Sequence, residues 1–197
     1  MVFFNSLLSM LHPLSRTVCL FSANLKTYNS LFIRFVLYGL PMTTIMTCPC
    51  NPNIAYQDCC GRYHAGAIPN TAQALMRARY SAYASQNIEF VKNTTLPVQQ
   101  AQLDMQAIAE WSQTSQWLGL EVLAETIAQD QRHATVEFIA HWHDAQGRQQ
   151  HQETSLFIKP AERWYFYDPN VPLKAERNAP CPCGSSIKFK KCCADYF

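Results

Sequence analysis

The chain has 197 residues, enough for one domain of ordinary size with small additions. Hydrophobic residues make up 48% of it and charged residues 15%, which is typical of a globular protein and excludes a disordered one. The formal net charge of +2 does not by itself predict a nucleic-acid partner.

The first segment, residues 1–41, differs in composition from the rest. It is rich in Leu, Phe and Ser, contains no Asp or Glu, and is interrupted by Lys and Arg. A membrane span needs about 20 consecutive apolar residues, so we predict none here. We interpret the segment as an over-extended start, with Met42 or Met46 as the natural first residue. A targeting sequence and a structured or membrane-associated arm are the alternatives.

Four cysteines come next, in a segment that we place at residues 46–66. They have the spacing C-x-C-x8-C-C and are Cys48, Cys50, Cys59 and Cys60. Asn51 and Asn53 follow the first pair, and Asn tolerates positive φ. We therefore predict a tight turn that swings the sulfurs of these cysteines to one side.

The middle segment, residues 70–172, begins with helical periodicity. Apolar residues recur at the spacing of a helix face, and Asn70 or Thr71 is suited to be the first N-cap. Pro97 is expected to end the second helix. The predicted helices span residues 71–86, 88–94 and 104–113.

Strand patterns follow the helices. The predicted strands span residues 117–123, 133–143, 152–159 and 163–168. In the first strand, Leu118, Leu120 and Val122 are predicted to share one face. Helices followed by an antiparallel meander predict an α+β fold.

No catalytic set can be identified in this segment. The candidates are Glu137, His141, His143 and Asp168. On a period-2 strand the first three lie opposite the apolar face that should meet the helices, so we interpret them as a polar outer face. A metal-binding pair of His141 and His143 is the alternative. Asp168 precedes Pro169, and we expect an Asx turn there.

A second set of four cysteines repeats the first spacing in residues 178–197. These are Cys181, Cys183, Cys192 and Cys193. Four thiolates at short spacing can surround one Zn²⁺ ion, so we predict two zinc ions per chain. The ninth cysteine, Cys19, lies alone in the first segment. A disulfide framework and an iron–sulfur cluster are the rival interpretations.

These cysteine segments resemble a known motif. Residues 181–193 read CPCGSSIKFKKCC and resemble the SEC-C motif, the zinc knuckle at the C-terminus of the SecA translocation ATPase. Residues 48–66 read CPCNPNIAYQDCCGRYHAG and are similar to the N-terminal form of that motif in the bacterial YchJ family. The usual Gly-Ser-Gly is replaced by residues 51–53, and Ser186 and Ile187 replace a Gly and a Lys.

The resemblance covers residues 47–197 and implies a fold and a metal, but no reaction. It implies a cone-shaped domain similar to nuclear transport factor 2 and SnoaL proteins, with helices on a curved antiparallel sheet and a zinc knuckle at each end. We expect a cytoplasmic protein.

Two functions are compatible with these patterns. The first is a non-enzymatic adaptor whose second knuckle docks an acidic or phosphate-bearing protein or ribonucleoprotein. The residues proposed to dock are Lys188, Phe189, Lys190 and Lys191. The second function is a small-molecule binder or enzyme with a pocket between helices and sheet. The residues proposed to line it are Tyr80, Tyr83, Phe138, Trp142 and Trp164.

Overall fold

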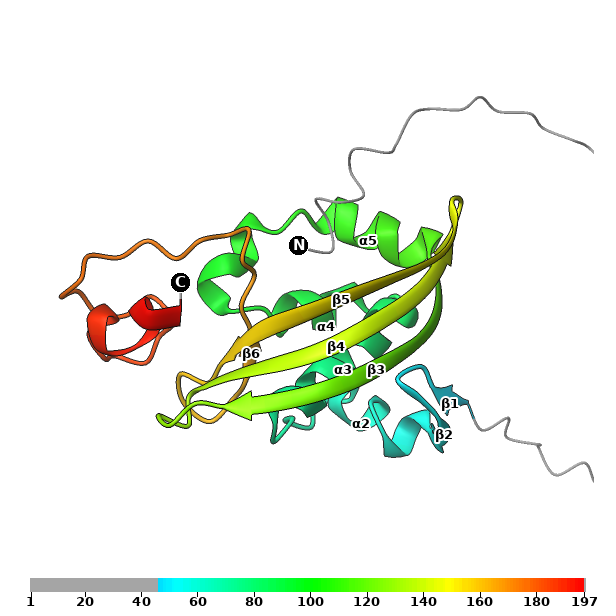
Figure 1. The fold of residues 1–197 in the computed structure, drawn as a ribbon, viewed down its shortest axis with the longest axis horizontal. Coiled ribbons are helices and arrows are strands. Elements are labelled where there is room, and N and C mark those ends of the chain that lie inside the picture. The colour runs from blue at the N-terminus through cyan, green and yellow to red at the C-terminus, as the bar shows by residue number, and fades with distance from the viewer. Residues whose placement is uncertain (1–45, 197) are drawn as a thin grey trace, which may run out of the picture.

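A four-stranded antiparallel sheet in the order β3-β4-β5-β6 forms the centre of the fold, and a two-stranded sheet, β1-β2, precedes it (Figure 1). The computed structural model describes residues 46–196, so the interpretation of residues 1–41 lies outside the described residues. The strands are β1 Thr47–Cys48, β2 Asn51–Ala55, β3 Gln116–Ile127, β4 His133–Asp144, β5 Gly147–Ile158 and β6 Tyr165–Phe166.

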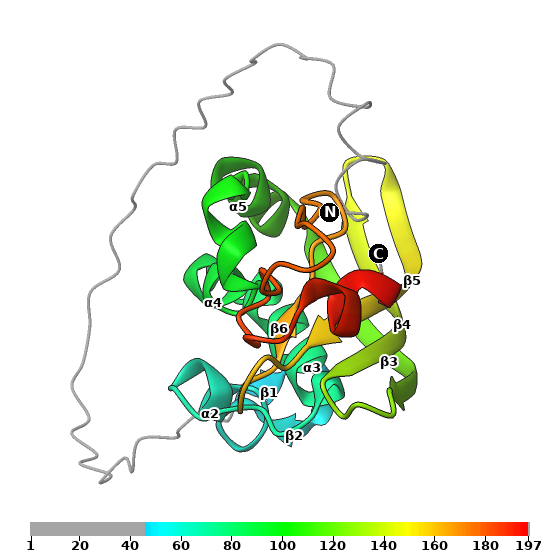
Figure 2. The ribbon, with the colours of Figure 1, turned by 90° about the vertical axis from the view of Figure 1, so that its left-hand side faces the viewer.

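The helices lie between the two sheets in the sequence and cover one face of the larger sheet (Figures 1 and 2). The α-helices are α2 Gly61–His64, α3 Ala72–Ala84, α4 Ile88–Asn93 and α5 Met105–Thr114. The 3₁₀ turns are η2 Tyr56–Asp58, η3 Pro97–Gln102, η4 Phe189–Lys191 and η5 Cys193–Tyr196. The predicted α+β class is confirmed. No helix within residues 46–196 combines the length and hydrophobicity needed to cross a membrane.

The helices begin where side chains can cap them. Thr71 Oγ1 accepts a hydrogen bond from Ala74 N at 3.0 Å, and Asp104 Oδ1 accepts one from Ala107 N at 3.0 Å. Each cap satisfies a backbone N–H that has no partner inside its helix. The predicted starts of α3 and α5 are therefore confirmed.

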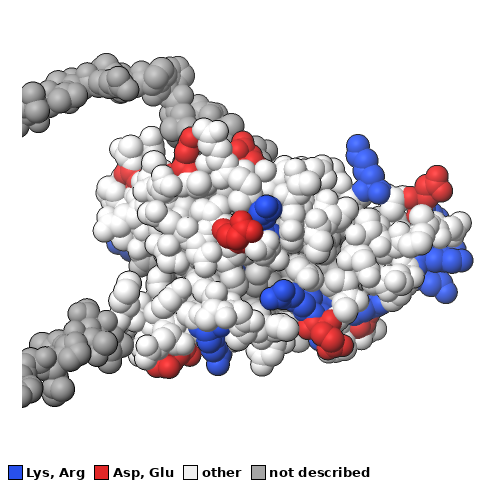
Figure 3. Space-filling view, turned by 180° about the vertical axis from the view of Figure 1, so that it is seen from behind, with Lys and Arg blue, Asp and Glu red and all other residues white. Residues whose placement is uncertain are grey.

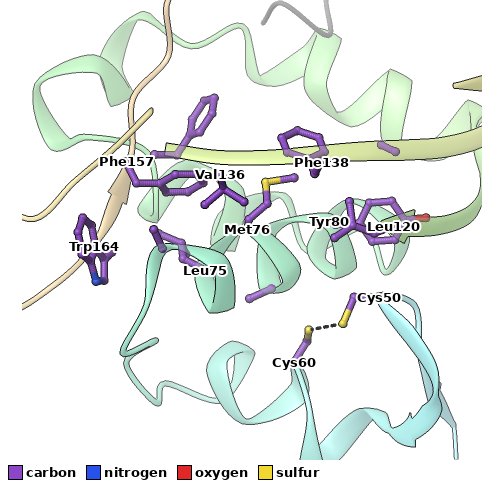
Figure 4. Packing of buried hydrophobic residues seen from close by; sticks show 14 of the residues in the cluster. Cys50, Cys60, Leu75, Met76, Tyr80, Leu120, Val136, Phe138, Phe157 and Trp164 are labelled. Atoms are coloured by element: carbon purple, nitrogen blue, oxygen red, sulfur yellow. Dashed lines mark hydrogen bonds between the residues drawn. The ribbon is translucent and has the colours of Figure 1, made fainter. Parts of the chain in front are cut away.

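The core lies between α3 and the inner face of the sheet. Leu75, Met76 and Tyr80 of α3 are buried against Val136 and Phe138 of β4, as Figure 4 shows. Alternate residues of β4 are buried, so the predicted inner face of this strand is confirmed. Each large apolar side chain buried here contributes about 1.5–3 kcal/mol.

Strand β3 departs from the predicted alternation. Its register against β4 shifts between Trp117 and Gly119, and the extra residue turns Leu118 to the outside. Leu118 is 43% exposed, whereas Leu120 is 9% exposed. Gly119 has φ +153° and donates its N–H to Tyr80 Oη at 2.7 Å. The prediction that Leu118 shares the inner face with Leu120 is wrong because of this bulge.

The last two strands differ from their predicted lengths. β5 starts at Gly147 because the hairpin with β4 closes through a two-residue turn, with Asp144 paired to Gly147. β6 is only two residues long. β6 ends at Phe166, and two residues later Asp168 Oδ1 accepts from Asn170 N at 2.9 Å. The predicted Asx turn is confirmed, and the strand ends before it.

The bulge gives a matched pair of leucines on one strand. Leu120→Ala should lower the free energy of unfolding by about 2–4 kcal/mol, because it removes a buried side chain. Leu118→Ala should change it by less than about 0.5 kcal/mol, because that side chain is exposed. Urea unfolding measures both values. A large loss in both variants would show that Leu118 belongs to the core.

Candidate metal centres

The first cysteine set closes around a single point. Three of its sulfurs lie close to Cys50 Sγ, at 3.5 Å for Cys48, 3.6 Å for Cys59 and 3.4 Å for Cys60. All four Sγ atoms lie within 4.8 Å of one another. Only Cys59 is half-exposed, and the other three are buried. A two-residue turn at Pro49 and Cys50 joins β1 to β2, with Cys48 paired to Asn51, so the predicted tight turn is confirmed, although neither Asn51 nor Asn53 adopts positive φ.

The second set has the same arrangement near the other end of the chain. Cys192 Sγ lies 3.6 Å from Cys183 Sγ and 3.8 Å from Cys193 Sγ, and all four cysteines are buried. The turn after Cys183 uses positive φ at Gly184, 93°, and at Ser186, 62°. Ser186 thus adopts the left-handed conformation that favours Gly, although the motif usually has Gly there.

The sulfurs in each set are separate thiols. Their separations exceed the disulfide bond length of about 2.05 Å, and all eight cysteines of the described chain are free. Hydrogen bonds from Cys60 lower the pKa of Cys50 to about 5, whereas the pKa of Cys60 is raised by the same contact. Likewise, a hydrogen bond from Cys193 lowers the pKa of Cys183 to about 4. Neighbouring thiolates thus suppress each other's ionisation, so four thiolates together require a cation.

The first set is held against helix α3. The buried Ser81 Oγ lies 3.4 Å from Cys48 Sγ. His64 contacts the Tyr56 hydroxyl through Nδ1, and its Nε2 lies 2.9 Å from the Ala78 carbonyl oxygen. Both ring nitrogens of His64 are therefore engaged away from the sulfurs. In Figure 4 the Cys50 and Cys60 side chains meet beneath α3.

The second set is held against the start of β4. His133 is fully buried, with Nε2 at 3.3 Å from Cys193 Sγ and Nδ1 at 2.6 Å from Asp130 Oδ2. The Tyr196 ring stacks on the His133 ring at 3.9 Å and 11°. Such partners of a ligating group fix its orientation and tune its affinity for metal.

The lysines proposed to dock a partner surround the second set. Lys188 and Lys191 are exposed, and Lys190 is half-buried. Phe189 is half-buried and packs against the cluster that contains the four cysteines. Figure 3 shows Lys and Arg side chains at this end of the molecule. We call Lys188, Lys190 and Lys191 the lysine face.

The proposed pocket aromatics occupy different places. Tyr83 and Phe138 line a cavity of about 40 Å³ between the helices and the sheet. Tyr80 Oη accepts from Gly119 N, Trp142 Nε1 donates to Asp144 Oδ2 at 3.1 Å, and Trp164 Nε1 donates to Asn70 O at 3.3 Å. On the outer face, His141 Nε2 lies 2.8 Å from Glu121 Oε1.

Sequence reasoning missed several residues at these places. Ser81 and His133, which contact the cysteines, gave no signal in their spacing. Arg79, Glu153 and Asp168 line the cavity. Arg79 was recognisable, because it is a charged residue on the apolar face of a helix, three positions from Met76 and from Ala82.

The buried contact of His133 predicts a loss of stability on its removal. His133→Phe keeps a ring to stack on Tyr196 but removes both polar contacts, which should cost about 1–3 kcal/mol of unfolding free energy. The matched control, His141→Phe, acts on the outer face and should cost less than about 0.5 kcal/mol. Equal losses by thermal unfolding would contradict a holding role for His133.

Two family models match the chain. The YchJ middle NTF2-like domain matches residues 71–169, and the SEC-C motif matches residues 177–195. Neither of these two covers residues 48–60. The SEC-C match and the cysteine clusters suggest metal binding.

Solved structures agree with these matches. A crystal structure of a SEC-C motif containing protein from Psychrobacter arcticus is 42% identical, with TM-score 0.69, and the match covers 78% of this chain and 98% of that one. The solution structure of RPA3114, a SEC-C motif containing protein from Rhodopseudomonas palustris, is 34% identical, with TM-score 0.57, covering 62% of this chain and 96% of that one. With its NTF2-like middle domain and its SEC-C motif, the chain belongs to the YchJ family.

Proposed function

We propose that each cysteine set binds one Zn²⁺ ion through four thiolates. A tetrahedron of sulfurs about 2.3 Å from zinc has sulfur–sulfur distances of about 3.8 Å. In the first set the sulfurs in contact lie from 3.4 Å apart, for Cys50 and Cys60, to 3.9 Å apart, for Cys59 and Cys60, and all four lie within 4.8 Å of one another. The donor set thus fits one ion with little rearrangement. Thiolates of an iron–sulfur cluster bind different iron atoms, which suits four converging sulfurs less well.

Such centres are structural. Catalytic zinc keeps one coordination position open for water or substrate, whereas four thiolates fill all positions of a tetrahedron. Bound zinc supplies the positive charge that four neighbouring thiolates require. Ser81 and His133 orient the sulfurs through their contacts with Cys48 and Cys193. The apolar residues packed around each set limit the access of water to the sulfurs.

Metal analysis tests the proposal. Protein purified without added metal should contain two zinc ions per chain. Cys183→Ser should reduce the content to one, because it removes a ligand of one set, whereas Cys19→Ser should leave two. A ratio near one in the parent, or absorption bands of iron, would overturn the zinc assignment.

We also propose that the chain is a non-enzymatic adaptor, which docks an anionic protein or ribonucleoprotein through the lysine face and Phe189. The observation that carries the proposal is a difference of charge between the knuckles. Residues 178–197 hold three Lys against one acid, Asp195, whereas residues 46–66 hold only Arg62 and Asp58. Exposed positive charge steers acidic partners and speeds their association.

The proposed division of the chain follows from these roles. The N-terminal knuckle spans residues 46–66, the NTF2-like domain residues 70–172, and the C-terminal knuckle residues 178–197. In this arrangement the central domain carries both knuckles, and they lie toward opposite ends of the long axis of the molecule (Figure 1). A cytoplasmic location suits eight reduced thiols.

Loss of the lysine face should weaken binding to polyanions. A variant with Lys188, Lys190 and Lys191 changed to Ala should elute from immobilised heparin at lower salt than the parent. It has three fewer positive charges to attract the polyanion, so less salt is needed to screen the attraction. It should also recover fewer partners from lysate at low salt.

The control removes the same charge elsewhere. In the control variant, Lys92, Arg148 and Arg163 are changed to Ala and the lysine face stays intact. Its elution and its recovery of partners should be nearly unchanged. Zinc content is measured in all three proteins, so that loss of a knuckle is not mistaken for loss of a surface. Equal elution of the two triple variants would remove the main support for the adaptor.

A further inference from the structure

The cavity between α3 and the sheet has a lining unlike an ordinary core. Six of its lining side chains are apolar: Met76, Val91, Leu103, Ile108, Phe138 and Phe166. The others include the charged residues Arg79, Glu153 and Asp168. Arg79 and Asp168 are 5% and 3% exposed, and the Glu153 side chain is 9% exposed. Charged groups are rarely buried this deeply unless their environment compensates them.

Three of these polar groups keep hydrogen-bonding capacity. Every hydrogen bond of Arg79 within the described chain uses Nη1, which donates to Val91 O at 2.7 Å and to Thr94 Oγ1 at 2.8 Å. Arg79 Nε and Nη2 therefore remain as donors. Glu153 Oε1 accepts from Ser155 Oγ at 2.6 Å, but its buried Oε2 has no hydrogen-bond partner. The hydroxyl of Tyr83 also makes no hydrogen bond among the described residues.

The contacts around Glu153 Oε2 do not satisfy it. His151 Nε2 lies 3.4 Å from it, close enough for an ion pair when the imidazole is protonated, but Oε2 accepts no hydrogen bond. Leaving a buried acceptor without a partner costs stability, and most such groups in native proteins have a functional or hydration role. Oε2 is thus available to a donor that enters the cavity.

Charge and size limit what could enter. The cavity lining holds one guanidinium and two carboxylates, and this excess of acidic groups favours a monocation over an anion. The cavity volume of about 40 Å³ is the space open to the centre of a water-sized sphere. One water needs about 10–15 Å³ of that space, so the cavity holds about three waters or a molecule of comparable size.

We propose that this cavity binds a small protonated amine that also carries an acceptor oxygen. The ammonium donates to Glu153 Oε2, the oxygen accepts from Arg79 Nη2 or the Tyr83 hydroxyl, and the carbon atoms contact Met76 and Phe138. This site is independent of the metal centres and of the lysine face.

Ethanolamine is the probe, and the methyl group of Met76 is the reporter. In protein labelled with ¹³C at methionine methyls, the Met76 resonance, assigned through Met76→Leu, should shift in a saturable manner with ethanolamine. Acetate and ethylene glycol should leave it unmoved at the same concentrations. A flat response to ethanolamine would show that the cavity holds water alone, and an equal response to acetate would contradict the proposed charge.

Two variants locate the binding. Glu153→Gln should weaken ethanolamine binding by at least about tenfold, because it removes a charge-assisted hydrogen bond. Glu137→Gln makes the same change on the outer face of the sheet and should leave binding unchanged. Equal affinity in both variants would overturn the site.

Stability distinguishes a binding group from a structural one. Glu153→Gln keeps a side-chain oxygen that can accept from Ser155 Oγ and replaces the other oxygen by an amide of the same size, so the melting temperature should change little if Oε2 awaits a ligand. A fall of more than about 4 °C would show that the carboxylate already stabilises the fold, and the proposal would fail.

Discussion

The convergence of four sulfurs within 4.8 Å, at two places in the chain, is the constraint on which the rest depends. Four thiolates at this separation repel one another strongly where water is excluded, and four thiols would leave weak, poorly satisfied hydrogen-bonding groups in their place. The arrangement is therefore suited to hold a cation at each centre. Because most of these cysteines are buried, binding of that cation would stabilise the whole fold and not the knuckle alone.

Each centre is continuous with the core of the central domain. Cys48, Cys50 and Cys60 pack in the same cluster as Leu75 and Tyr80 of α3. Helix α3 therefore has the first cysteine set on one side and the sheet on the other. The second set packs with Leu96, Ile158 and Tyr167, where β5 and β6 end. The polar contacts of Ser81 and His133 to the sulfurs add direction to this apolar packing, so each knuckle has a defined orientation on the domain.

The sequence predicted what depends on local patterns. The repeated cysteine spacing, the helix starts near Thr71 and Asp104, and the alternation along β4 are all local, and the structure agrees with them. The exposure of Leu118 was not predictable in this way, because the bulge depends on the pairing of β3 with β4. The contact of His133 with Cys193 joins residues 60 positions apart, and the grouping of Arg79 with Glu153 depends on tertiary packing. Spacing along the chain carries no information about such contacts.

A core that holds Arg79, Glu153 and Asp168 is costly to build, because charged groups lose their hydration when they are buried. Arg79 and Glu153 also keep part of their hydrogen-bonding capacity unused, which ordinary packing would have eliminated. The middle domain therefore draws less stability from its interior than an apolar core of the same size would give. The cysteine sets packed against α3 and the end of the sheet would, with metal bound, add stability from outside the cavity. The cysteine sets and the polar cavity are thus related: stability gained at the cysteine sets would allow the domain to keep charged groups in its interior.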